Sequence, residues 1–128
     1  MTTEQKRELA IDFATALKTR NTELLQSFVT EDVVWSLPGT SLMSGEVHGV
    51  DGILMRAEIL DAFEVNVQIE HIVVGYKDVG FLLHNTGRKD GKLLDEYLTT
   101  ILTLRGNKIQ RLDTLISDVP MLNEYFVK

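Results

Sequence analysis

Five polar residues in the C-terminal half of the chain have types that could support acid–base chemistry: Asn85, Glu96, Thr100, Arg111 and Asp113. Arg111 and Asp113 are two positions apart in a stretch typical of a strand, so their side chains share one face. Burial of a carboxyl among apolar residues favours its neutral form, whereas a neighbouring guanidinium favours the anion. If burial dominates, Asp113 is a general acid or base near neutral pH; if Arg111 dominates, it is a fixed anion that orients ligand or water.

Two turns decide which of these residues meet. Asp90-Gly91 and Gly106-Asn107 are typical of two-residue turns between antiparallel strands. Counting outward from the turns gives the cross-strand partners, and a β-bulge would move every residue beyond it to the other face. The first turn pairs Asn85 with Glu96 and Phe81 with Thr100. The second turn pairs Leu102 with Arg111, Thr100 with Asp113, and Leu98 with Leu115.

Strict alternation then assigns the residues of these strands to two faces. One face gathers apolar residues around the five polar ones: Phe81, Leu83, Asn85, Leu94, Glu96, Leu98, Thr100, Leu102, Leu104, Ile109, Arg111, Asp113 and Leu115. An apolar surface with a few convergent polar groups is typical of a pocket for a small organic molecule. The alternative is that Arg111 and Asp113 form a structural ion pair and do nothing else.

The opposite face is also rich in apolar side chains: Leu82, His84, Thr86, Tyr97, Thr99, Ile101, Thr103, Leu112, Thr114 and Ile116. An exposed apolar face of this size predicts a homodimer formed through the outer face of the sheet. The alternative is an ordinary half-exposed sheet built from residues that favour strands.

A second candidate site pairs Glu96 with Asn85, and its alternative is a solvated pair at the mouth of the pocket. Thr100 and Leu98 would line the same surface. Trp35 ends the first strand and could line the mouth with two methionines, although a lone aromatic residue also fits the core.

The elements that must position these residues are helices followed by strands. Thr2 and Gln5 form a capping box that starts a helix over 3–20, and further helices are expected at 22–28 and from 51 to about 63. Strands are expected at 33–37, around 65–70, and at 79–88, 93–105 and 108–118, with an irregular loop over 38–49 and a short helical turn after Pro120. This order predicts an α+β fold in which three N-terminal helices wrap a curved antiparallel sheet into a cone.

Length and composition exclude several classes of protein. The 128 residues suit a single domain spanning 1–128. With 13 Lys and Arg against 19 Asp and Glu, the net charge of −6 argues against binding nucleic acid or anionic membranes. The polar N-terminus and the lack of a long apolar run predict a cytoplasmic protein.

Motifs for metals, cofactors and nucleophiles are missing. The chain has no cysteine, and His48, His71 and His84 show no metal-ligand spacing; His84 is expected to be a hydrogen-bonded structural residue. No GxSxG or GxGxxG motif and no phosphate-binding loop occurs. We therefore expect neither a metal nor a cofactor.

Several short motifs, in this order and spacing, resemble the nuclear transport factor 2-like superfamily and its SnoaL-like (polyketide cyclase-like) branch, which is shared with ketosteroid isomerase. They are Ala16-Leu17, Asp32-Val33-Val34-Trp35, Pro38-Gly39, Ser44-Gly45-x-x-x-Gly49-x-Asp51-Gly52-Ile53, and the hairpins at 88–92 and 105–109. The resemblance covers nearly the whole chain. It implies a cone-shaped cystatin-like roll with an interior cavity, commonly dimeric through the outer face of the sheet.

The resemblance also argues against ketosteroid isomerisation. Leu37 occupies the position of the isomerase's catalytic base, Phe13 that of its oxyanion-hole tyrosine, and Thr100 that of its protonated second aspartate. The aspartate of the cyclases falls near Asp113 or Thr114. Phe13 and Thr100 are therefore expected to line the pocket without supplying the isomerase's groups.

Two hypotheses follow. In the first, the protein is a cofactor-independent isomerase, cyclase, dehydratase or hydrolase acting on a small, largely apolar organic molecule, with Asp113 as acid or base and Arg111 as its electrostatic partner. In the second, it is a noncatalytic homodimer that binds a ligand or has a structural role. An enclosed pocket reached by Asp113 or Glu96 would favour the first.

Overall fold

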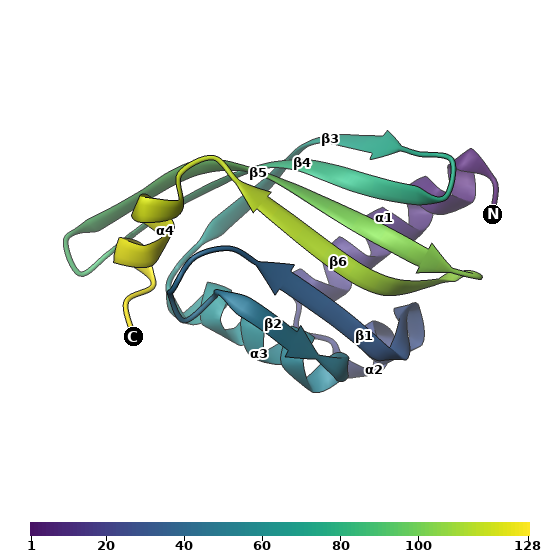
Figure 1. Cartoon of the computed structure of the whole chain (residues 1–128), viewed down its shortest axis with the longest axis horizontal. Coiled ribbons are helices and arrows are strands. Elements are labelled where there is room, and N and C mark those ends of the chain that lie inside the picture. Colours follow the sequence, from purple (N-terminus) through teal and green to yellow (C-terminus); the bar gives the residue numbers. More distant parts are fainter.

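The computed structural model describes residues 1–128 as four helices and six strands (Figure 1). The helices are α1 (Thr3–Lys18), α2 (Thr22–Phe28), α3 (Gly49–Ala62) and α4 (Val119–Tyr125). The strands are β1 (Val29–Leu37), β2 (Gly45–His48), β3 (Asn66–Val74), β4 (Asp78–Lys89), β5 (Lys92–Arg105) and β6 (Lys108–Ile116). All six strands form one sheet, in the order β2-β1-β6-β5-β4-β3.

Three of the helices begin at side-chain caps. At α1 the predicted capping box is present, because the Thr2 hydroxyl accepts from the amide of Gln5 and the Gln5 side chain accepts from the amide of Thr2. The side chain of Asn21 caps α2, and that of Asp118 caps α4 by accepting from the amide of Met121. These caps satisfy amides that have no partner within the first turn.

The sheet curves around the helices, as Figure 1 shows, with α1, α2 and α3 behind it and α4 across one end. Its inner face, which carries Phe81 and Leu102, packs against α1 through Phe13. Its outer face carries no helix in this view. The α+β fold with a curved sheet is therefore confirmed.

Three details differ from the sequence prediction. A four-residue strand, β2, lies within the segment expected to be a loop and pairs with β1. β1 pairs with β6 in parallel, so the sheet is mixed, although the other four pairings are antiparallel. The expected helical turn after the last strand is a full helix, α4, which closes one end of the inner face.

The predicted register of the β4–β5 hairpin is confirmed. Asn85 pairs with Glu96 and Phe81 with Thr100. Asp90 and Gly91 both have positive φ, as a two-residue turn of this kind requires.

The predicted register of the β5–β6 hairpin is wrong beyond its first residues. A β-bulge leaves Gln110 without a partner, because Leu104 pairs with Ile109 and Thr103 with Arg111. The bulge moves the rest of β6 by one position, so that Thr100 pairs with Thr114 instead of Asp113. Leu112, Thr114 and Ile116 therefore face inward, and Arg111, Asp113 and Leu115 face outward.

The core beneath the sheet consists of two apolar clusters. The larger, which we call the α1 cluster, contains Leu9, Ala10, Phe13, Ala16, Leu25, Val29, Val33, Trp35, Ile53, Val79, Phe81, Leu102, Ile109 and Leu112. The smaller, which we call the α4 cluster, contains Leu37, Met43, Leu94, Leu122, Tyr125 and Phe126. The hydroxyl of Tyr125 also donates to the carbonyl of Phe63 over 2.6 Å, which ties α4 to the segment that follows α3.

Candidate functional site

Polar residues cross the inner face between the two apolar clusters. On β5, Glu96, Leu98 and Thr100 lie between Leu94 of the α4 cluster and Leu102 of the α1 cluster. The neighbouring strands add one inward polar residue each, paired with these. We call the set the interior belt: Asn85, Glu96, Leu98, Thr100 and Thr114.

The interior belt is buried to the same degree as the apolar core on either side of it. Asn85, Leu98, Thr100 and Thr114 retain 5–8% of their exposed surface, and core residues such as Leu9 and Leu37 retain 8% and 6%. The belt therefore differs from the core in polarity and not in exposure.

Two apolar residues of the edge strand β3 are exposed beside the belt. Val67 pairs with Asn85, and Ile69 pairs with Leu83, so both point to the inner face. These two residues are nevertheless 39% and 40% exposed. The edge of the sheet next to the belt is therefore apolar and in contact with solvent.

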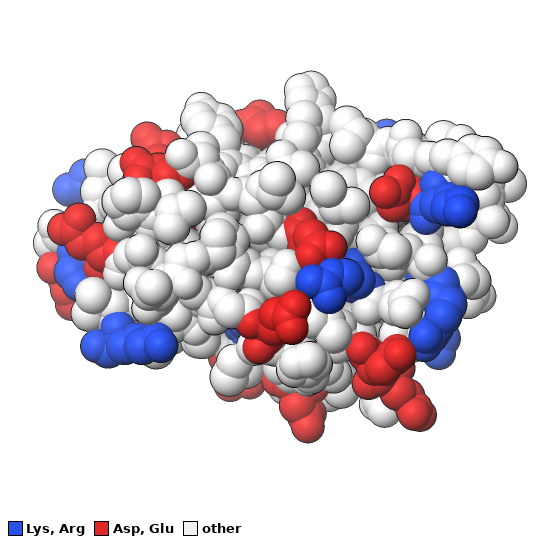
Figure 2. Space-filling view, viewed as in Figure 1, with Lys and Arg blue, Asp and Glu red and all other residues white.

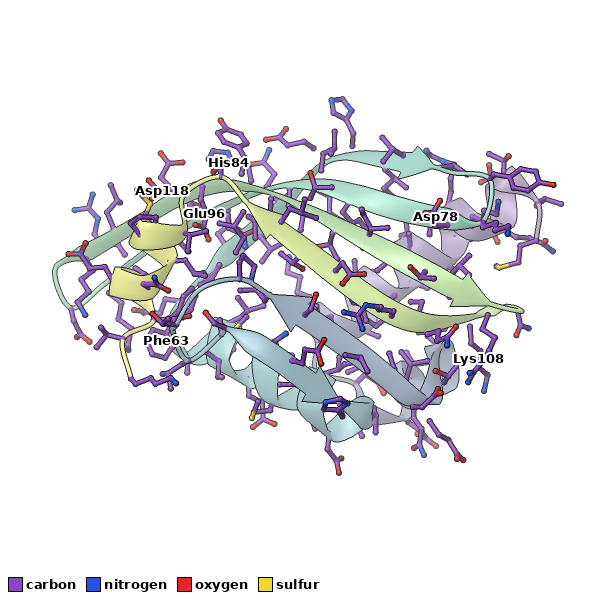
Figure 3. All side chains as sticks on the ribbon, viewed as in Figure 1. Phe63, Asp78, His84, Glu96, Lys108 and Asp118 are labelled. Atoms are coloured by element: carbon purple, nitrogen blue, oxygen red, sulfur yellow. The ribbon has the colours of Figure 1, made fainter.

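Glu96 is the most secluded residue of the belt. It is 1% exposed, and neither of its carboxyl oxygens has a hydrogen-bond partner. Burial raises the pKa of Glu96 to about 7, and the negative charge of Asp118 adds to the effect. Figure 3 shows Glu96 and Asp118 at the same end of the sheet, beside α4. The side-chain oxygen of Asn85, on the adjacent strand, also has no partner. This end of the belt holds a carboxyl that changes charge near neutral pH.

The other end of the belt is a short chain of hydrogen bonds. The indole nitrogen of Trp35 donates to the Thr114 hydroxyl over 2.9 Å, and the hydroxyls of Thr114 and Thr100 are 2.9 Å apart. All three residues are buried. The chain joins β1, β6 and β5.

Arg56 on α3 lies fully buried against Trp35. Its guanidinium donates to the carbonyls of Trp35 and Gly45, over 2.8 and 2.7 Å, and lies 5.2 Å from the centre of the indole ring. Burial lowers the pKa of Arg56 to about 10, so it stays charged at neutral pH. Arg56 thereby fastens α3 to β1 and β2 and holds the indole in place.

Arg111 and Asp113 do not face the interior, so the placement on which their predicted role depends is wrong. The bulge at Gln110 turns both to the outer face, where their side chains are 39% and 36% exposed. There the guanidinium contacts Asp113 over 3.0 Å and Glu46 over 3.2 Å, and Ser36 donates to Asp113 over 2.6 Å. The group ties β6 to β1 and β2. It has no contact with the interior belt.

The remaining predicted residues lie inside. Asn85, Glu96, Leu98 and Thr100 form the interior belt together with Thr114, and Trp35 adjoins it. Phe13 lies in the α1 cluster at 1% exposure, so it contributes to the core. His84 is hydrogen-bonded to Asp95 over 2.6 Å on the outer face, as expected of a hydrogen-bonded residue.

Sequence analysis missed Thr114 and Arg56. Thr114 was assigned to the outer face, and only the bulge brings it inside. Arg56 did carry a signal, because it lies between Ile53 and Ala57 on the apolar side of α3, where a charged residue is unusual.

The outer face holds a broad hollow of about 680 Å³, lined by Glu70, His71, Leu82, Leu83, Tyr97, Leu98, Thr99, Leu115, Ile116 and Ser117. Figure 2 shows this side of the molecule, where much of the surface over β4, β5 and β6 carries no charged side chain. Tyr97 and Leu115 are 59% and 55% exposed.

No three His, Asp or Glu side chains gather closely enough to hold a metal ion. None of the four helices is both long and apolar enough to cross a membrane.

No protein-family model and no curated protein matches the chain. Solved structures do resemble it. Bal32a, from a soil-derived mobile gene cassette, has a TM-score of 0.87 at 18% identity, over 96% of this chain and 97% of that one. A nuclear transport factor 2-like protein of Burkholderia xenovorans LB400 has a TM-score of 0.85 at 19% identity, over 98% of both chains. A protein of Jannaschia sp. CCS1, named as a SnoaL-like polyketide cyclase, has a TM-score of 0.73 at 14% identity, over 98% of this chain and 94% of that one.

These similarities show that the chain has the nuclear transport factor 2-like fold, as the sequence motifs suggested. Because the identities are below 20%, they establish the fold alone. The chemistry must be argued from the interior belt.

Proposed function

We propose that the protein is a cofactor-independent acid–base catalyst for a small, largely apolar organic molecule, and that Glu96 is its acid or base. The observation that carries the proposal is a buried carboxyl with no hydrogen-bond partner, set in a polar belt between two apolar clusters. An unpartnered carboxyl in the interior costs stability, and a functional site is where such a cost is retained. Asn85 would hold the substrate beside Glu96, and Leu98 would contact its apolar part.

The environment of Glu96 suits proton transfer at neutral pH. A catalytic group works best when its pKa lies near the working pH, and burial raises the pKa of Glu96 to about 7. The group can therefore accept a proton from a carbon acid or return one to a product. The reaction class this favours is isomerisation, cyclisation or elimination by proton abstraction.

A general probe of such a base is 5-nitrobenzisoxazole. A base removes the ring C–H proton, the freed electron pair becomes the third bond of a nitrile, and the N–O bond breaks to release a coloured phenolate. We expect the wild type to accelerate this reaction, with a rate that rises with pH through about 7 as the Glu96 carboxylate forms. Glu96→Gln should lower the rate by about 100-fold or more.

The matched control is Glu58→Gln, which makes the same exchange at an exposed position of α3 and should leave the rate unchanged. Equal rates in the wild type and Glu96→Gln would contradict the proposal. A carbon-13 titration of the Glu96 carboxyl that gave an ordinary glutamate pKa would contradict it as well.

We also infer that a second copy of the chain covers the outer face. The hollow of about 680 Å³, the exposed Tyr97 and Leu115, and the scarcity of charge around them support a self-complementary contact. Leu115→Lys would place two unpaired charges at such an interface and should convert a dimer to single chains. Leu24→Lys, on the exposed side of α2, should not. A wild type that sediments as a single chain at 100 μM would contradict the inference.

The cytoplasmic location and the lack of a cofactor, both expected from the sequence, remain predictions.

A further inference from the structure

We infer that α4 is a lid over the Glu96 end of the interior belt, and that Asp118, at the start of α4, couples the opening of this lid to the charge on Glu96. The role of the lid in admitting a substrate rests on the proposed acid–base function. The coupling between charge and opening does not, because it depends only on the contacts of Glu96, Asp118 and α4.

A molecule can reach Glu96 only if one of the elements that cover it moves. Glu96 is 1% exposed, and both of its carboxyl oxygens are buried. The helices α1, α2 and α3 contribute to the α1 cluster of 14 buried residues, so their movement would disrupt the main core. α4 belongs to the smaller cluster of 6 and pairs with no strand, so its movement would leave the sheet and the α1 cluster intact. α4 is therefore the cover that moves at the lowest cost.

α4 lies directly against the part of β5 that carries Glu96. Leu94 precedes Glu96 by two residues on the same face of the strand, and it packs in the α4 cluster. The amide of Asp95, between them, donates to the sulfur of Met121 on α4 over 3.2 Å. Figure 3 shows Glu96 beside this helix. Displacement of α4 would thus uncover this end of the belt.

Two hydrogen bonds hold the far side of α4 to the segment between β1 and β2. The side-chain oxygen of Asn123 accepts from the amide of Thr40 over 2.8 Å, and the carbonyl of Phe126 accepts from the amide of Leu42 over 2.9 Å. Both would break when α4 moves away, so the Leu42 amide reports on the opening.

Asp118 connects the start of α4 to Glu96. Ser117 and Tyr97 exchange two hydrogen bonds of 2.9 Å, which continue the β5–β6 pairing by one residue beyond β6. The next position along places Asp118 across from Glu96. The carboxylate of Asp118 caps α4 by accepting from the amide of Met121 over 3.0 Å. One side chain therefore starts the helix and faces the buried carboxyl.

The other groups around Glu96 do not offset a negative charge on it. β4 contributes the neutral Asn85, and on α4 the phenol of Tyr125 stays neutral because burial raises its pKa. The charge of Asp118 is the one that acts on the pKa of Glu96, and it raises it. When Glu96 loses its proton, two like charges face each other and one of them has no hydrogen-bond donor. Opening of α4 would admit water to both.

The direction of the pH effect follows from the two states of the lid. Burial under the closed lid raises the pKa of Glu96 from 4.5 to about 7, whereas water restores the ordinary value when the lid is open. Between these values the open state carries the anion and the closed state keeps the proton. Opening should therefore become more frequent as the pH rises from about 4.5 to about 7, by up to about 300-fold, and then level off.

Amide hydrogen exchange followed by NMR tests the coupling without any ligand. The amides of Leu42 and Phe126 should lose protection between pH 5 and pH 8, after correction for the chemical exchange rate. The amide of Leu102, in the α1 cluster, reports unfolding of the whole chain and should stay better protected at each pH. Equal protection of Phe126 and Leu102 at every pH would show that α4 leaves only on global unfolding, which would overturn the inference.

Three variants separate the charges involved. Glu96→Gln should abolish the pH-dependent loss of protection at Leu42. Asp118→Asn keeps a side chain that caps helices but removes the charge, so the loss should become smaller. The matched control is Glu124→Gln, which removes a charge from the exposed side of α4 and should behave as the wild type. An unchanged pH dependence in Glu96→Gln or in Asp118→Asn would overturn the coupling.

A disulfide lock tests the role of the lid in access. The chain has no cysteine, so Thr40→Cys with Asn123→Cys introduces one defined pair at positions that are already in contact. Oxidation should lower turnover of 5-nitrobenzisoxazole about 10-fold or more, and dithiothreitol should restore it. The single variant Thr40→Cys should be indifferent to both reagents. Full turnover by the oxidised double variant would overturn the role in access. A wild type without turnover would contradict the proposed function and leave the exchange result unaffected, so the two proposals fail separately.

Discussion

Glu96 on the inner face of the sheet and Asp113 on the outer face are both carboxyls on neighbouring strands, but their surroundings are opposite. Asp113 accepts from Ser36 and Arg111 and is in contact with water. Glu96 has no donor and almost no exposed surface. Asp113 is thus engaged by its hydrogen-bond partners, whereas Glu96 has none and its pKa is raised to about 7. The groups that contact a carboxyl therefore determine its chemistry more than the apolar residues near it in the sequence do.

The largest difference between the two faces should be in the stability lost when apolar residues of β5 are shortened. Leu102→Ala removes a side chain that is fully buried in the α1 cluster and should cost about 3 kcal/mol of unfolding free energy. Leu93→Ala makes the same change on the outer face, where the residue is 56% exposed, and should cost under about 1 kcal/mol. Urea denaturation at low protein concentration measures both. Similar losses would mean that the two faces are equally buried.

The next effect concerns the charge on Glu96. Because its pKa rises from 4.5 in the unfolded chain to about 7 in the folded one, the folded state binds the extra proton. Stability should therefore fall as the pH rises from about 4.5 to about 7 and then level off. Glu96→Gln removes this pH-dependent loss of stability, and above pH 8 it should be more stable than the wild type by up to about 3 kcal/mol.

Below pH 4.5 the two proteins should have similar stability, since Glu96 is then neutral in both the folded and the unfolded chain. Denaturation curves at pH 4, 6 and 8 test this prediction. If the difference in unfolding free energy between Glu96→Gln and the wild type were the same at all three pH values, Glu96 would not be buried as an unpartnered acid.

The smallest effect is expected from the outer-face ion pair. Asp113→Asn weakens contacts with Ser36 and Arg111 that are open to solvent, so it should cost less than about 1 kcal/mol. It should also leave turnover of 5-nitrobenzisoxazole unchanged, since Asp113 does not reach the interior belt. A 100-fold loss of turnover would instead place Asp113 in the chemistry, contrary to its position on the outer face.

Much of the fold could be predicted from local signals. The capping box at Thr2 and the Asp90-Gly91 turn each define their own surroundings, so the start of α1 and the β4–β5 register were correct. The pairing of Asn85 with Glu96 followed from that turn. The parallel pairing of β1 with β6 joins distant segments and has no local signal.

The candidate site could be predicted only in part, for one physical reason. The two ends of the interior belt lie on either side of the β5 strand, and only the β4 side has a regular register. On the β6 side, the bulge at Gln110 reverses which residues face inward. The sequence prediction, which assumed a regular register, therefore placed Asp113 where Thr114 lies. Polarity alone did carry a hint: Leu112, Thr114 and Ile116 make a more plausible interior than Arg111, Asp113 and Leu115.

Because Gln110 is unpaired, the face on which each later residue of β6 lies depends on whether the number of residues between the turn and Leu112 is odd or even. Between the turn and Leu112, removing or adding a single residue would exchange the charged and uncharged rows of β6 and bury two ionised side chains. A change of two residues would preserve the rows. Variation in the length of this hairpin is therefore expected to be tolerated in steps of two, as a consequence of one extra glutamine.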